Sequence, residues 1–273
     1  MKIWLKIAKL PKSSYYEWVE KLNIINQKEA ELVEIIKEII TESKGRFGYR
    51  RVNMELRARG IIVNHKKVLR LMRENCVLCI KFGRKNRKYS SFKGEIGKVA
   101  DNVINQEFYV EKANEIWLSD ITEFSIPKDE RKLYLSPILD LYNSEILSYS
   151  IGFSPTVALT NKSLKLALNK LPESHNLIIH TDQGFHYQHK SWTNMLDARK
   201  IRQSMSRRGN CLDNSPMENF FGILKQEMFY GENFENLEHL KREIENYINW
   251  YNNKRRKEKL NGLSPIEYRL QAA

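Results

Sequence analysis

Three successive strand-like runs between residues 115 and 153 constrain the fold more than any other feature of the sequence. They read EIWLSDITEFSI, KLYLSPILDLYN and EILSYSIGF, and they are rich in β-branched and aromatic residues. Only a short charged segment and an Asn-Ser turn separate them. Because such short links join antiparallel neighbours, we expect these runs to form the antiparallel part of a sheet.

The region that follows alternates helical and strand-like patterns. A helix is predicted at about residues 160–171, and HNLIIHTD then reads as a buried strand, since a continuous apolar run is typical of a central parallel strand. A helix at about residues 192–199 precedes the short strand IRQSMS, and the polar loop RRGNCLDN leads into a helix that begins at Ser215. The pattern predicts an α/β fold in which helices flank a mixed five-stranded sheet.

The N-terminal part of the chain reads as all-α. The segment KEAELVEIIKEIITE, at residues 28–42, has apolar residues at three- and four-residue spacing, which predicts an amphipathic helix. A shorter helix is expected before it, capped by Ser13 or Ser14.

Two further helices follow, and the second is basic. The first is predicted at about residues 50–58, and the second, capped by Asn64, at about residues 65–74. A helix, a short turn and a basic helix have the outline of a helix-turn-helix. Lys66 and Arg70 could then face DNA, although an ordinary solvated helical hairpin fits this segment equally well.

These patterns divide the chain into four predicted segments. They are a helical region at residues 1–78 with the helix-turn-helix at about 45–75, a basic linker at 79–112, the α/β core at 113–232 and a C-terminal helical extension at 233–273. The linker is assigned because its basic residues are mixed with Gly and Ser and lack apolar periodicity.

The charge balance points to a polyanionic partner. The chain carries 46 Lys and Arg against 33 Asp and Glu, a net charge of +13 spread along its length, as expected for a protein that binds nucleic acid. Cys76 and Cys79 have C-x-x-C spacing but lack the second pair that a zinc site needs. No apolar run approaches the ~20 residues of a membrane span, and the first residues do not read as a signal peptide. We therefore expect a cytoplasmic protein without membrane contact.

Three acids, Asp120, Asp182 and Glu218, are the candidate catalytic and metal-binding residues. Asp120 lies in the first strand-like run, Asp182 follows the apolar run of the parallel strand, and Glu218 lies in the first turn of a helix. Carboxylates brought together repel one another, and a bound cation removes that conflict. Oxygen ligands favour Mg²⁺ or Mn²⁺ over zinc, and two such ions can act on a phosphodiester.

Each acid also has a simpler interpretation. Asp120 could be a hydrogen-bonded strand residue, and Asp182 could be a turn residue in Asp-Gln-Gly. Glu218 taken alone fits a capping box better than a metal site, because Ser215 would occupy the N-cap and Glu218 the N3 position.

The helix beyond Glu218 strengthens the functional interpretation. Lys225 lies seven residues on, only about 20° from the same face of an α-helix. Gly222 lies between them on that face, and a glycine inside a helix costs up to ~1 kcal/mol. A face with a carboxylate, bare backbone and a cation would let DNA approach a metal, although a merely tolerated glycine is the alternative.

Polar residues around the acids form a second group of candidates. Those assigned to DNA binding are His180, Gln183, Asn210 and Asn214, with turn formation as the alternative for the loop residues. Asp140 and Asp213 are competing carboxylates, and we expect Asp140 to lie near the site without binding metal.

With these residues identified, the chain resembles the transposases of bacterial insertion sequences, in the group typified by insertion sequence three. These proteins share an integrase-type core with retroviral integrases. The matching motifs, in order, are FGYRRVNMELRARG, WLSDIT, YLSPILDLYN, HTDQG, SMSRRGNCLDNSPMENFFGILKQE and YINWYNNKRRKEKLNGLSP. The most specific match is the spacing of 35 residues between Asp182 and Glu218, with Lys225 seven residues beyond.

The resemblance implies an RNase H-like fold with Asp120, Asp182 and Glu218 as the metal-binding triad and Lys225 as a DNA-contacting cation. It implies Mg²⁺-dependent cleavage of DNA at the element end, followed by attack of the freed 3′-hydroxyl on another phosphodiester. The expected partners are element-end and target DNA, further copies of the chain in the bacterial nucleoid, and an upstream-frame protein that a frameshift can fuse to this downstream-frame one. Two alternatives remain: an RNase H-like nuclease without strand transfer, and a DNA-binding regulator with an inactive core.

Overall fold

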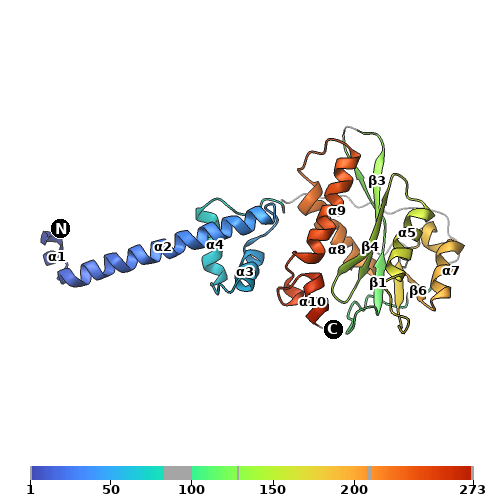
Figure 1. The fold of residues 1–273 in the computed structure, drawn as a ribbon, viewed down its shortest axis with the longest axis horizontal. Coiled ribbons are helices and arrows are strands. Elements are labelled where there is room, and N and C mark those ends of the chain that lie inside the picture. The colour runs from blue at the N-terminus through green and yellow to red at the C-terminus, as the bar shows by residue number, and fades with distance from the viewer. Residues whose placement is uncertain (1, 83–99, 128, 208–210, 272–273) are drawn as a thin grey trace. The chain divides into compact units, whose positions relative to one another are not determined.

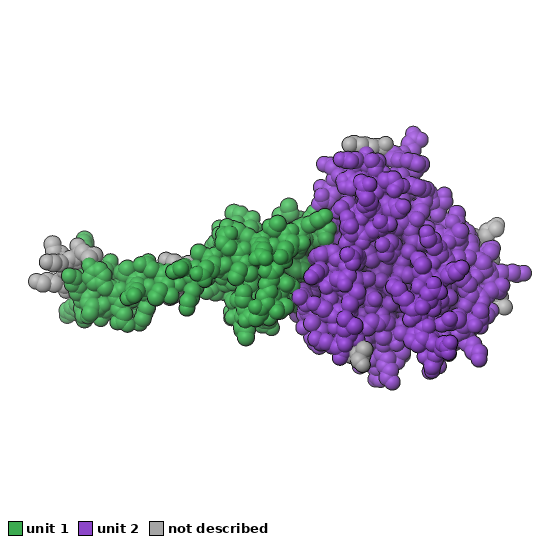
Figure 2. Space-filling view, viewed as in Figure 1, with its two compact units in different colours: residues 1–82 green, residues 83–273 purple. Residues whose placement is uncertain are grey.

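The computed structural model describes residues 2–82, 100–127, 129–207 and 211–271. The chain divides into two compact units, residues 1–82 and residues 83–273 (Figure 2). The most basic part of the predicted linker, at residues 83–99, lies outside the described residues. None of the helices in the described ranges is long and apolar enough to cross a membrane.

The first unit is helical, and its long helix differs from the prediction. After α1 (Lys2–Ile7), the two helices expected before residue 43 form one continuous helix, α2 (Lys12–Glu42). The predicted cap at Ser13 or Ser14 is wrong, because the helix begins after Pro11, which makes no side-chain capping bond. A proline at this position suits a helix start, since its fixed φ is compatible and no N–H is lost.

The helix-turn-helix outline is confirmed. Helix α3 (Tyr49–Ala58) ends before Gly60, which has a φ of +79°, and α4 (His65–Glu74) follows. Asn64 caps α4 as predicted, because its side-chain oxygen accepts a hydrogen bond of 2.8 Å from the Lys66 N–H. The apolar face of α2 packs with those of α3 and α4, and the buried residues are Leu32, Ile36, Ile39, Val52, Leu56, Val68, Leu71 and Met72.

The second unit is built on a mixed sheet. Its strands are β1 (Ile116–Ser119), β2 (Thr122–Ser125), β3 (Lys132–Asp140), β4 (Glu145–Gly152), β5 (Ile178–Thr181) and β6 (Arg202–Met205). Strand β3 pairs antiparallel with β1, β2 and β4, whereas β1, β5 and β6 are parallel. The antiparallel part and the parallel part both agree with the prediction.

Strands β1 and β2 are two halves of one strand. Ser119 pairs with Ile138 and Thr122 with Leu135, so both halves keep the same register against β3. The interruption falls at Asp120 and the next residue, opposite Pro137, which has no N–H to donate to the ladder. The six strand segments therefore lie along five lines, which confirms the predicted five-stranded sheet.

Helices cover both faces of this sheet (Figure 1). One face carries α5 (Val157–Leu168), α6 (Phe185–Gln188) and α7 (Lys190–Ala198). The other carries α8 (Ser215–Leu224), the π-helical turn η2 (Lys225–Phe229) and α9 (Leu237–Asn253). Alternation along β1 explains the division, because Trp117 joins the first core and Leu118 joins the second.

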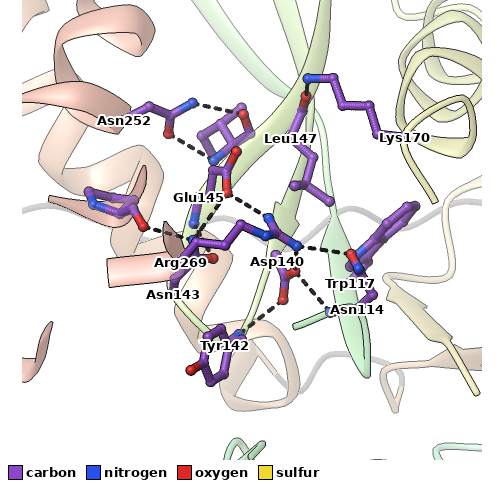
Figure 3. A network of polar contacts seen from close by, with 12 residues as sticks. Asn114, Trp117, Asp140, Tyr142, Asn143, Glu145, Leu147, Lys170, Asn252 and Arg269 are labelled. Carbon is purple, nitrogen blue, oxygen red and sulfur yellow. Dashed lines mark hydrogen bonds and ion pairs between the residues drawn. The ribbon is translucent and has the colours of Figure 1, made fainter. Parts of the chain in front are cut away.

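The C-terminal helix is bound to the edge of the same sheet through a polar network (Figure 3). Arg269 of α10 (Pro265–Gln271) donates to Asp140 at 2.8 Å and to Glu145 at 2.6 Å. The Asn252 side chain of α9 bonds both the N–H and the carbonyl of Ile146, at 3.0 and 2.9 Å. Helices α9 and α10 are thus bound to β3 and β4, in the antiparallel part of the sheet.

Candidate active site

Two of the three candidate acids lie at the carboxyl ends of neighbouring parallel strands. Leu118 of β1 pairs with His180 of β5. Asp120 and Asp182 each follow two residues later, so they leave the sheet at the same level and at the same edge. Functional groups of open α/β sheets gather at this edge, because the strand ends there open into loops.

Asp120 occupies the interruption between β1 and β2. Its Oδ1 accepts a hydrogen bond of 2.7 Å from the N–H of Ile121, the other residue of this interruption. Burial raises the pKa of Asp120 well above its usual value, and the carboxylates of Asp182 and Glu218 raise it further. The Ile121 N–H and the Lys225 charge act in the opposite direction.

Asp182 is held by a tight turn after β5. Its Oδ1 accepts a hydrogen bond of 2.9 Å from the Gly184 N–H. A Cβ at Gly184 would lie 2.9 Å from the same oxygen, so no larger residue fits without moving the carboxylate. Burial raises the pKa of Asp182, while the Gly184 N–H and nearby His186 lower it. The turn therefore fixes a carboxylate whose negative charge is disfavoured.

Glu218 lies in the first turn of α8, but the predicted capping box is wrong. A 3₁₀ turn, η1 (Cys211–Asn214), places Asn214 at the N-cap, where its side chain makes no capping bond. The Glu218 carboxyl is half-buried, and burial raises its pKa. The Glu218 carboxylate raises the pKa of Asp120, although less than the Asp182 carboxylate does.

Gly222 and Lys225 follow Glu218 along α8 and at its end. A Cβ built on Gly222 would meet nothing within 4 Å, so the backbone there borders open space. The Lys225 Nζ lies 5.2 Å from the centre of the Phe124 ring in β2, and its charge reaches Asp120. A carboxylate, open backbone and a cation thus follow one another along the helix.

The three acids suit a hard divalent cation, although they do not form a complete coordination shell by themselves. The three acids offer carboxylate oxygens only, which suit Mg²⁺ or Mn²⁺. In the part of the chain that the structure describes, no three His, Cys, Asp or Glu side chains are close enough to hold one ion. Mg²⁺ needs no such cage, since one or two carboxylates, water and substrate phosphates commonly complete its shell.

His180 and Asn214 are buried, which corrects the expectation that they contact DNA. The His180 ring nitrogens bond the hydroxyls of Ser204 and Ser206, at 2.9 and 3.0 Å, and burial lowers its pKa to about 4. It is neutral at pH 7 and connects β5 to β6 beneath Asp182. Asn214 Nδ2 lies 3.5 Å from the carbonyl of Ser119, so it connects the start of α8 to the residue before Asp120.

The other polar candidates separate as follows. Gln183 is half-buried and donates to the Ser206 carbonyl at 3.0 Å, whereas Asn210 lies outside the described residues. Asp140 was expected near the site, but it pairs with Trp117 at the opposite end of β1. It is instead the partner of Arg269, and this position corrects the prediction.

Asp213, the second competing carboxylate, stabilises the loop before α8. It accepts hydrogen bonds from the Arg207 backbone N–H at 2.8 Å and from its guanidinium at 3.0 Å. Asn102 and Gln106 donate to the same carboxylate at 2.9 and 2.8 Å. The Arg207 guanidinium holds the pKa of Asp213 far below its usual value. The Asp213 carboxylate therefore has a structural role.

Tyr187 is a site residue that the sequence reasoning missed. Its side chain is buried, and its hydroxyl lies 3.4 Å from the Ser119 Oγ, beside the first acid. Burial raises its pKa well above the usual value, and Asp120 and Asp182 raise it further. Its position five residues after Asp182, within a run of aromatic residues, was the available signal.

The predicted DNA-contacting residues of the first unit lie on α4. Lys66 is exposed in the first turn of this helix. Arg70 is exposed too, but its guanidinium is bound by Glu74 at 2.9 Å and by Glu29 at 2.8 Å. Any phosphate contact by Arg70 has to compete with these two carboxylates, so Lys66 is the better candidate of the pair.

Comparisons with known proteins agree with this arrangement. An HTH-like domain matches residues 27–86, and integrase core domains match residues 110–211 and 218–272. The transposase InsK of insertion sequence element IS150 from Escherichia coli (strain K12) is 42% identical over 267 residues, 98% of this chain and 92% of that protein. A transposase-like protein of Haemophilus influenzae is 47% identical, over 78% of this chain and 95% of its own length.

A third relative identifies the family of transposases. The transposase InsF of insertion sequence IS3A, also from E. coli, is 31% identical over 98% of this chain and 93% of its own length. Near-complete coverage of these relatives, together with the order of the helix-turn-helix and integrase core matches, shows that the chain belongs to the IS3 family of insertion-sequence transposases, the DDE polynucleotidyl transferases that move DNA elements.

Proposed function

We propose that this DNA transposase cuts a DNA strand at the end of its element and joins the freed 3′-hydroxyl to a second DNA, with Asp120, Asp182 and Glu218 as the catalytic centre. The observation that carries the proposal is the pairing of Asp120 and Asp182 at the ends of two parallel strands. Two carboxyls with raised pKa values share this edge of the sheet, and a cation would stabilise both as carboxylates.

Asp120 and Asp182 would hold a divalent metal, Mg²⁺ or Mn²⁺, together with Glu218 from α8. We propose that the site takes two such ions. When bound, the metal supplies an activated oxygen nucleophile and stabilises the leaving oxygen of the phosphodiester. Support comes from the oxygen-only donor set and from the carboxylates of Asp182 and Glu218, both of which raise the pKa of Asp120.

The residues of the chain itself perform the positioning. The Gly184 N–H and the Ile121 N–H orient one oxygen of each aspartate. Open backbone at Gly222 allows a DNA strand to approach α8, and the Lys225 ammonium pairs with a phosphate. In the first step water attacks phosphorus and the 3′-oxygen leaves as a free 3′-hydroxyl. In the second, that 3′-hydroxyl attacks a phosphodiester of the target, and the 3′-oxygen of the target strand leaves. Neither step needs a covalent bond between protein and DNA.

The partners follow from the same reaction. Joining two DNAs requires an element end and a target at one centre, and we propose that copies of the chain assemble on paired ends in the nucleoid. The helix-turn-helix unit, with Lys66 on its basic helix, would contribute sequence-independent phosphate contacts. We also propose an upstream-frame protein as a further partner in this assembly.

The test uses the single substitutions Asp120→Asn, Asp182→Asn and Glu218→Gln in the full chain. Each should abolish nicking of an element-end duplex in Mg²⁺ or Mn²⁺ while the affinity for that duplex, measured in EDTA, stays within a few-fold of the original. Asp140→Asn is the matched control, because it removes a buried carboxylate at the opposite end of β1. Nicking that survives any of the three substitutions would contradict the assignment of that acid.

A further inference from the structure

The helix that carries Glu218 changes its hydrogen bonding at Lys225. Helix α8 is α-helical to Leu224, and the Lys225 N–H still bonds the carbonyl of Phe221. From there the chain forms η2, in which the Tyr230 N–H bonds the Lys225 carbonyl at 2.8 Å, five residues back. Such π-turns are rare and occur frequently at functional sites, so other contacts have to stabilise this one.

A buried ion pair provides that stabilisation. The Glu227 carboxylate, inside η2, accepts two bonds from the Arg255 Nε, at 2.9 and 3.2 Å, and one from its Nη2 at 2.8 Å. The Tyr247 hydroxyl of α9 donates to the same carboxylate at 2.8 Å. The side chains of Glu227 and Arg255 are 0% and 2% exposed, so neither can bind DNA directly.

Stability alone does not account for this pair. Two charges of this kind are costly to bury, and replacing a buried ion pair by apolar side chains of similar size is often neutral or stabilising. Geometric definition is a better explanation, because a carboxylate bound by a planar guanidinium and a hydroxyl can occupy only one place. Since Glu227 lies inside the turn, fixing it also fixes how the turn is rotated about its axis.

The two ends of η2 meet at one ring, on the strand that continues from the first acid. The Lys225 Nζ lies 5.2 Å from the centre of the Phe124 ring, and the Phe229 ring packs edge-on against it with centroids 5.2 Å apart. Phe124 is buried in β2, the strand that continues from Asp120. A rotation of η2 would therefore move the Lys225 ammonium relative to the acids.

We propose that the Glu227–Arg255 ion pair is a positioning device for Lys225. The pair sets the π-turn that holds the Lys225 ammonium over Phe124, where the ammonium meets a phosphate of the element end. This inference rests on the proposed role of Lys225 in DNA binding. Glu227 and Arg255 act only through Lys225, so their effect on DNA binding disappears when Lys225 is absent.

The experiment is a double-mutant cycle on the full chain with an element-end duplex as the probe, in EDTA and at several salt concentrations. Lys225→Ala removes the cation, and the combined substitution Glu227→Met and Arg255→Met replaces the ion pair by apolar side chains. Each should lower the salt slope of the association constant by about one phosphate contact. Added to Lys225→Ala, the apolar replacement should cause no further decrease in slope or affinity.

A neighbouring ion pair gives the control. Arg256, the residue after Arg255, binds Glu267 at 2.6 Å. In the protein that retains Lys225, Arg256→Met combined with Glu267→Met should leave the salt slope of the association constant unchanged. If the apolar replacement does not fold, Glu227→Gln, which keeps the shape of the side chain and one acceptor oxygen, goes through the same cycle with the same expected results.

The outcomes separate the two claims. An unchanged slope for the apolar replacement, or additive losses in the Lys225→Ala background, would overturn the positioning role while leaving Lys225 as a DNA contact. An unchanged slope for Lys225→Ala itself would remove Lys225 from the DNA interface, and both the contact and its positioning would be overturned.

Discussion

Replacing Gly222 by alanine should make the protein more stable and less active. Gly222 lies inside α8, where alanine is favoured over glycine by about 0.8–1.0 kcal/mol. A Cβ there meets nothing within 4 Å, so no steric cost offsets the gain. For a unit the size of residues 83–273, this corresponds to a rise of about 2–4 °C in Tm.

The activity should change in the opposite direction. The added methyl group occupies the surface along which the DNA strand is proposed to approach, between Glu218 and Lys225. Displacement of a reacting group by ~1 Å can cost on the order of 10²-fold in rate, so nicking of an element-end duplex should fall by about that factor. Thermal unfolding in EDTA and single-turnover nicking in Mg²⁺ measure the two effects on the same preparations.

An exposed position in another helix provides the control. Asn246 of α9 donates only a local hydrogen bond of 3.2 Å to Glu243, and Asn246→Ala should leave nicking unchanged. A Gly222→Ala protein that gains stability and nicks DNA at the original rate would refute the idea that this helix face meets DNA. A loss of stability would refute the open space at Gly222.

Three further predictions concern the turn, the acids and the first unit. Gly184→Ala should cut nicking by about 10²-fold, because its Cβ would lie 2.9 Å from the Asp182 Oδ1; unchanged nicking would exclude this turn from the site. Burial raises the pKa values of Asp120 and Asp182 in the folded protein. Without metal, the free energy of unfolding should therefore fall as the pH rises from the ordinary pKa of a carboxyl group through these raised values. Mg²⁺ or Mn²⁺ should restore the free energy of unfolding near neutral pH. Denaturant titrations measure this, and an identical pH profile after Asp120→Asn and Asp182→Asn would contradict it. A fragment of residues 1–82 should bind duplex DNA weakly at low salt, and Lys66→Ala should reduce its salt slope; fluorescence anisotropy without detectable binding would contradict the DNA-binding role.

Much of the fold was predictable because its determinants are local. The short links of residues 115–153 require antiparallel strands, and the apolar run before Asp182 requires a buried one. The Asn64 cap and the α3–α4 pair likewise depend on residues within a few positions of one another. Asp182 is predicted at the end of its strand, but Asp120 reads as a mid-strand residue, so the sequence did not predict the break between β1 and β2 that brings Asp120 level with Asp182.

The errors have in common that distant residues decide them. His180 reads as a residue beside the catalytic acid, but Ser204 and Ser206, more than 20 residues on, bury it. Asp140 ends an apolar run, yet its partner is Arg269, 129 residues away. Neither spacing nor periodicity carries such pairings, so a single sequence does not predict them.

Glu218 shows the same limit at short range. Its surroundings match the Ser-x-x-Glu capping pattern, and the pattern alone favours a cap. The 3₁₀ turn η1 moves the N-cap to Asn214, which itself lies against the Ser119 carbonyl of β1. A contact with the strand of the first acid therefore decides where the helix of the third acid begins.

The most direct test of the catalytic centre is strand transfer from a pre-cut element end. An oligonucleotide duplex with a free 3′-hydroxyl at the element terminus is incubated with a plasmid target, Mg²⁺ or Mn²⁺ and the full chain, and joined products are quantified. We expect joining by the unaltered protein and by Asp140→Asn, and none by Asp120→Asn, Asp182→Asn or Glu218→Gln. Joined product from any of these three variants at the original rate would contradict the catalytic role of the substituted acid.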